Sequence, residues 1–138
     1  METTERTPTI LNWRTRAFPV DWASEFGRNG SLMLEVGFGD GRFTVQSAAL
    51  QPELNIFGLE VSTASLMHAK KRIDNAGTTS IRLAKANAFF AIRHLFAPES
   101  LSVIIVNFPD PWPKEKHTKN RLLQDRFFQM AATRLVPG

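Results

Sequence analysis

The feature that most constrains the fold is an alternation of short apolar runs with segments of helical spacing. The apolar runs span residues 32–36, 56–61, 81–84 and 102–107, and the helical segments include 42–50 and 64–75. Parallel strands joined by right-handed helical crossovers produce this alternation. The sequence therefore predicts an α/β fold with a parallel sheet. Because a glycine-rich turn follows the first strand, the expected strand order is 3-2-1-4.

The chain has the size of one domain. It contains 138 residues, 43% of them hydrophobic, which suffices for a single buried core. We expect residues 1–30 to form an irregular lead-in with a short helix over 21–26, and residues 31–138 to form the ligand-binding domain. The run 103–106 is apolar on both faces, as interior strands are. We therefore expect further strands beyond it, and a domain that is incomplete after the helix that follows strand 4.

Composition excludes several classes of protein. No run approaches the roughly 18 apolar residues of a membrane span, and the polar start does not resemble a signal peptide, so we expect a cytoplasmic protein. Without cysteine there is no disulfide, thiolate nucleophile or iron–sulfur cluster. The three histidines lie in separate segments without ligand spacing, so no metal site is expected. The net charge of +4 suggests an anionic partner.

The glycine turn Gly37-Phe38-Gly39-Asp40-Gly41 separates the first strand from the first long helix. Gly37 and Gly39 let the backbone approach a ligand closely, and free N–H groups at a helix start favour a negative or polar group. The dinucleotide fingerprint requires a third small residue where Arg42 stands. A cofactor with a pyrophosphate is therefore disfavoured.

Polar side chains also follow the second and third strands. Glu60 ends the second strand about 20 residues beyond the glycine turn, where an acidic side chain accepts the hydroxyls of a ribose. Asn87 follows the third strand, where it could read an adenine edge or cap the next helix. The sequence leaves these two roles for Asn87 open.

A proline-locked turn follows the fourth strand. In Phe108-Pro109-Asp110-Pro111-Trp112-Pro113 the three prolines exclude both helix interior and central strand, so this segment is a stiff loop. The carboxyl end of a strand in an open α/β sheet is where ligands bind. Directly behind the loop comes a basic run with Lys114, Lys116, Lys119 and Arg121. A solvated charged face is the alternative interpretation of this run.

These residues together favour one kind of cofactor. Carboxylates of Glu35, Glu60 and Asp110 and the amide of Asn87 are expected on one rim, beside a glycine turn without pyrophosphate spacing. S-adenosylmethionine fits this set, with its amino acid end at the glycine turn, its ribose at Glu60 and its adenine at Asn87. Carboxylates tolerate its positively charged sulfonium.

The same motifs resemble those of the tRNA guanine-N7 methyltransferases, from residue 34 to residue 138. The matching residues are Leu34 to Gly41, Gly58 to Val61, Asn87-Ala88, and Phe108 to Lys114 with His117, Lys119 and Arg121. The resemblance implies a Rossmann-like class I methyltransferase fold, S-adenosylmethionine as cofactor, tRNA as partner and methylation of guanine N7.

The resemblance also implies roles for individual residues. Glu35, Glu60, Asn87 and Asp110 would line the cofactor site, and Asp110 would also be catalytic. Lys114 would contact tRNA, and we expect His117, Lys119 and Arg121 to belong to the same basic surface. Members of the family continue past the Pro-Gly at residues 137–138 into a segment with a Thr-Asp motif.

Two other functions remain open at this stage. An exocyclic-amino methyltransferase acting on nucleic acid would use a similar proline-held turn, although its Asp-Pro-Pro-aromatic order differs from the Asp-Pro-Trp-Pro of residues 110–113. A catalytically silent cofactor- or RNA-binding fragment, or a partner subunit, would keep the cofactor pocket without transferring a methyl group.

Overall fold

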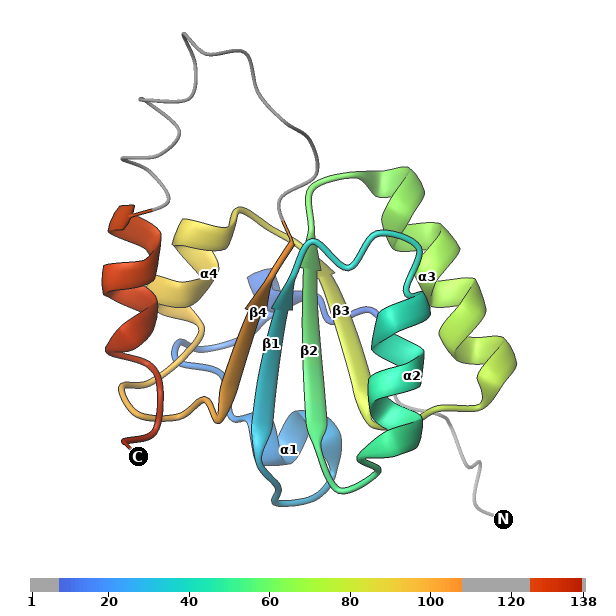
Figure 1. Ribbon diagram of the computed structural model, residues 1–138, viewed down its shortest axis with the longest axis horizontal. Coiled ribbons are helices and arrows are strands. Elements are labelled where there is room, and N and C mark those ends of the chain that lie inside the picture. Colours follow the sequence, from blue (N-terminus) through green and yellow to red (C-terminus); the bar gives the residue numbers. More distant parts are fainter. Residues whose placement is uncertain (1–7, 108–124, 138) are drawn as a thin grey trace, which may run out of the picture.

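The computed structural model describes residues 8–107 and 125–137. A parallel sheet lies between two layers of helices, and its strands point the same way (Figure 1). The elements are η1 (Trp13–Thr15), α1 (Trp22–Phe26), β1 (Leu32–Val36), α2 (Arg42–Leu50), β2 (Asn55–Glu60), α3 (Thr63–Ala76), β3 (Ile81–Lys85), α4 (Ala88–His94) and β4 (Val103–Val106). Residues 125–132 are also helical.

The sheet has the strand order β3-β2-β1-β4, with every pair parallel, so the predicted class and order are confirmed. Strand β4 lies at the edge of the described sheet, where the expected order places it, and the further strands that its apolar character predicts beyond it stay a prediction. Among the described residues β4 pairs with β1 alone, and Val103 is 40% exposed.

Local signals set the helix boundaries. The side chains of Asp21 and Ser62 accept hydrogen bonds from backbone N–H groups in the first turns of α1 and α3. Gly77 ends α3 with a φ of 71°, a left-handed conformation that glycine adopts without strain. The helices over 21–26 and 42–50 therefore lie where the sequence predicts them, with α1 beginning one residue later.

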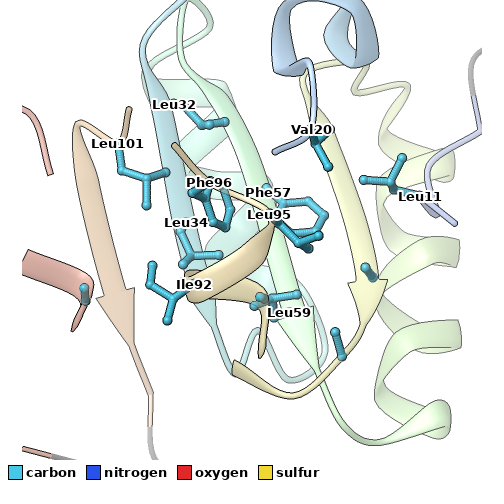
Figure 2. Close-up of a cluster of buried hydrophobic side chains, with 14 of the residues drawn as sticks. Leu11, Val20, Leu32, Leu34, Phe57, Leu59, Ile92, Leu95, Phe96 and Leu101 are labelled. Atoms are coloured by element: carbon cyan, nitrogen blue, oxygen red, sulfur yellow. The ribbon is translucent and has the colours of Figure 1, made fainter. Parts of the chain in front are cut away.

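Two hydrophobic cores lie on opposite faces of the sheet. Figure 2 shows part of the core on the α1 and α4 side, where Leu34, Phe57 and Phe96 are at most 2% exposed. Met33 and Ile56 point to the other face and pack with residues of α2 and α3. Spacing in the sequence also predicts a core-facing helical stripe of Leu123, Phe127, Met130, Ala131 and Leu135. Phe127 and Ala131 are buried, and Met130 and Leu135 pack partly buried against the same core. Leu123, of the same stripe, lies outside the described residues.

The lead-in is more ordered than the sequence predicts. Leu11 N donates to Leu83 O over 2.7 Å, and Leu83 N donates to Thr9 O over 2.8 Å, so residues 9–11 extend the sheet beyond β3. The indole of Trp13 donates to Lys85 O over 3.1 Å. These bonds pair backbone groups on the outer edge of β3 and place Trp13 at the carboxyl end of that strand. Within the described ranges, no helix has the length and apolar character that crossing a membrane requires.

Candidate active site

Glu35 lies at the carboxyl end of β1 and is completely buried. Its carboxylate accepts a hydrogen bond from Thr44 Oγ1 of α2 over 2.7 Å and another from Asn107 Nδ2 over 3.5 Å. Burial raises the pKa of Glu35, the bond from Thr44 opposes this, and the negative charge of Glu60 raises the pKa further. Glu35 thus ties β1 to α2 and to the residue after β4.

Gly37 and Gly39 both have positive φ, 82° and 60°, but for different reasons. A Cβ on Gly37 would overlap the backbone carbonyl of Asn107, whose side chain also donates to Gly37 O over 3.3 Å. A Cβ on Gly39 would meet nothing within 4 Å. Close packing within the chain therefore requires the glycine at position 37, whereas Gly39 borders open space in which a ligand can lie.

Glu60, at the end of β2, is held against the glycine turn. Its carboxylate accepts hydrogen bonds from Gly39 N over 3.0 Å and from Val61 N over 3.1 Å. The side chain is only partly buried. Because its charge also influences Glu35, the two carboxylates share one neighbourhood at the carboxyl ends of β1 and β2. This is the rim on which the sequence expects them.

Asn87 caps α4, because its Oδ1 accepts a hydrogen bond from Phe90 N over 3.1 Å. The capping role is thereby confirmed. The amide Nδ2 has no hydrogen bond to any of the described residues and stays available to a ligand. Asn87 also borders a hollow of 570 Å³ at the carboxyl ends of β2 and β3, together with Trp13, Arg14, Val61, Lys85, Ala86 and Phe90.

Other residues at this edge of the sheet were not predicted to belong to the site. Thr44 and Asn107 hold Glu35 in place, and Trp13 and Val61 form walls of the hollow. Val61 follows β2 directly and is 69% exposed, and no sequence signal marks it as part of the site. Trp13 could not be assigned to the site from the sequence either, because it reaches the hollow only through the pairing of the lead-in with β3.

Several predicted site residues cannot be placed. Asp110, Lys114, His117, Lys119 and Arg121 lie outside the described residues. Within residues 8–107 and 125–137, no group of three or more His, Asp or Glu side chains is arranged to hold a metal ion.

The sheet order, the glycine turn after β1 and the acid at the end of β2 define the fold of class I methyltransferases. A solved structure of phosphoethanolamine N-methyltransferase 2 from Haemonchus contortus, in complex with S-adenosyl-L-methionine, has this fold. It matches 85% of this chain and 25% of its own with a TM-score of 0.61 and 24% identity. Residues 29–138 match the family described as "Putative methyltransferase", and the chain belongs to that family.

Curated relatives confirm the resemblance found in the sequence. A tRNA (guanine-N(7)-)-methyltransferase of Thermus thermophilus is 45% identical over 129 residues, which are 94% of this chain and 42% of the relative. The enzyme of the same name from Bordetella pertussis is 41% identical over 120 residues, which are 87% of this chain and 47% of the relative. The chain thus spans less than half the length of these two relatives.

Proposed function

We propose that this protein binds S-adenosylmethionine and takes part in methylation of guanine N7 in tRNA. The observation that carries the cofactor assignment is the position of Glu60, whose carboxylate is fixed beside the open backbone of Gly39. The acceptor assignment rests on the names of the relatives, which are up to 45% identical to this chain. With tRNA as substrate, the proposal keeps the cytoplasmic location that the sequence predicts.

The residues at this edge fit the cofactor. The ribose hydroxyls would donate to Glu60, which has acceptor capacity beyond its two backbone bonds. The adenine would enter the hollow beside Val61, where Asn87 Nδ2 can donate to it. The amino acid end would lie along Gly39. Glu35 would support this site from below, holding the turn through Thr44 and Asn107.

The cofactor supplies an electrophilic methyl group, and the protein has to position its acceptor. Guanine N7 carries a free lone pair and no proton, so the transfer requires no general base but does require in-line placement and loss of water. Transfer leaves the purine positively charged. In this proposal Asp110 accepts hydrogen bonds that orient the guanine and stabilises the charge that develops on it.

The basic run would bind the RNA. Lys114, Lys119 and Arg121, with His117 among them, would neutralise backbone phosphates, which gives an affinity that falls as salt rises. Such contacts position the tRNA without reading its sequence.

Methyl transfer from radiolabelled S-adenosylmethionine to unmodified tRNA tests the proposal, with the modified nucleoside identified by mass spectrometry. We expect 7-methylguanosine as product, and we expect Asp110→Ala nearly to abolish transfer. Methylated adenosine or cytidine would favour the exocyclic-amino methyltransferase. Cofactor binding without any transfer would favour the silent module, and normal turnover by Asp110→Ala would exclude the role given to this residue.

A further inference from the structure

A second hollow lies at the opposite end of the sheet from Glu60, at the amino ends of the strands. Its volume is 210 Å³, and its lining residues are Thr9, Phe26, Arg28, Thr78, Thr79, Ser80 and Arg82. Arg28 comes from the turn between α1 and β1, and residues 78–80 connect α3 to β3. The lower end of the sheet in Figure 1, where α1 lies, is this end. None of the residues proposed for methyl transfer contributes to it.

Arg82 is only 5% exposed, and carbonyl oxygens hold its guanidinium in place. Its Nε donates to Glu25 O over 3.2 Å, and its Nη1 donates to Thr79 O and Ile81 O over 2.7 and 2.9 Å. Nη2 has no hydrogen bond to the described residues. In the described part of the chain, every fully buried side-chain nitrogen has a hydrogen-bond partner. Because Nη2 has none, it is not fully buried, and the hollow is the space that Arg82 lines.

Arg28 is fixed in the same manner. Its Nε donates to Asn55 Oδ1 over 2.7 Å, and its Nη2 donates to Pro52 O and Leu54 O over 2.8 and 3.1 Å. Its Nη1 has no hydrogen bond within residues 8–107 and 125–137. Two rigid guanidinium groups that line one hollow thus each keep one nitrogen for a ligand.

No carboxylate in the described part of the chain forms an ion pair with either arginine. Glu25, whose charge acts on Arg82, binds Arg16 over 2.6 Å. Asp74, near Thr9, accepts from the Thr9 hydroxyl over 2.6 Å and from Lys70 over 2.7 Å. Burial lowers the pKa of Arg82, and the negative charge of Glu25 offsets this only in part. The described residues that line the hollow thus include two arginines and no carboxylate.

We propose that this hollow binds a phosphate group. Planar guanidinium forks match the oxygens of a phosphate, and the hydroxyl groups of Thr78, Thr79 and Ser80 add donors on the facing loop. The volume admits one phosphate group with a few water molecules. The phosphate can be inorganic phosphate or a backbone phosphate of RNA, since both offer the same oxygens to the two arginines.

Titration with inorganic phosphate tests the proposal, with calorimetry and thermal unfolding as readouts and with sodium chloride matching the ionic strength. Arg28→Gln should weaken phosphate binding about tenfold or more, because it removes a charged donor. Thr79→Val leaves both arginines in place and should weaken phosphate binding by about threefold. This variant tests the site if Arg28→Gln folds poorly. Arg93→Gln removes the same charge from the exposed surface of α4 and should leave phosphate binding unchanged.

A phosphate effect no larger than that of chloride, or equal phosphate affinity in the wild type, Arg28→Gln and Thr79→Val, would overturn the proposal. The source of the phosphate follows from the affinity for tRNA in the same proteins. If Arg28→Gln binds tRNA more weakly than Arg93→Gln does, the site holds a backbone phosphate of RNA. If the two variants bind tRNA equally and Arg28→Gln binds inorganic phosphate more weakly, the site holds a free phosphate anion. The phosphate titration depends on neither methyl transfer nor tRNA binding, so failure of the proposed function would not affect it.

Discussion

The bond from Thr44 to Glu35 allows a quantitative test of the buried acid. Both side chains are fully buried, and Thr44 Oγ1 donates to Glu35 over 2.7 Å. Valine has nearly the shape of threonine but cannot donate. Thr44→Val should therefore cost about 1.5–3 kcal/mol of the free energy of unfolding while Glu35 is ionised, and about 0.5–1.5 kcal/mol once it is protonated. For a chain of this size, each kcal/mol lowers the Tm by roughly 3–6 °C.

The direction of the pH dependence follows from the pKa of Glu35. Burial raises this pKa in the folded state, so ionised Glu35 destabilises the fold above that value, and the cost disappears below the pKa of the unfolded chain. Thr44→Val removes the bond that lowers the pKa, so the pKa rises further. The loss of stability should accordingly be larger at about pH 7.5 than at about pH 4, which lies below the pKa of the unfolded chain.

Urea unfolding of the wild type and Thr44→Val at the two pH values measures this difference. Thr44→Ser is the matched control, because it keeps the hydroxyl and loses a buried methyl group, at a cost of about 1 kcal/mol that should not depend on pH. An equal loss for Thr44→Val at both pH values would refute the assignment of Glu35 as a buried acid stabilised by Thr44.

Three further predictions concern the turn, the cofactor and the RNA. Gly37→Ala should lower the free energy of unfolding by at least about 2 kcal/mol in urea, since it combines left-handed strain with overlap of a backbone carbonyl, and an equal loss in Gly39→Ala would contradict this reasoning. Glu60→Gln should weaken S-adenosylhomocysteine binding about tenfold or more in calorimetry, whereas the exposed Glu53→Gln should not, and unchanged affinity in Glu60→Gln would remove Glu60 from the ribose site. Lys114→Ala should weaken tRNA binding and reduce the slope of log affinity against log salt by about one, and an unchanged slope would exclude a phosphate contact.

Much of the fold could be predicted because its signals are local. Apolar runs, the cap at Ser62 and the glycine stop at Gly77 each act within a few residues, so the order of strands and helices follows from the sequence. What lies against the outer edge of β4 is not a local property, and the further strands expected there stay a prediction. The apolar character of β4 suits an interior strand, yet among the described residues its partners lie on one side, and Val103 is 40% exposed.

In the candidate site, too, features set by nearby residues could be predicted, and contacts between distant segments could not. Glu60 could be located from sequence because a fixed spacing separates it from the glycine turn. The cap at Asn87 could also be anticipated, although the sequence did not decide between a cap and an adenine contact. The bonds from Thr44 and Asn107 to Glu35 could not be anticipated, since they join segments up to 72 residues apart.

The sequence by itself determined the order of strands and helices and, to within one residue, where each strand ends, since strand and turn preferences depend on neighbours along the chain. Only the tertiary structure decided which of those residues are buried and which stay open. It places Glu35 beneath the turn, separates the packing role of Gly37 from the open side of Gly39, and brings Arg28 and Arg82 to one hollow. The physical reason is that burial and hydrogen bonding depend on distances in space, which close packing of α2, α3 and the strands fixes.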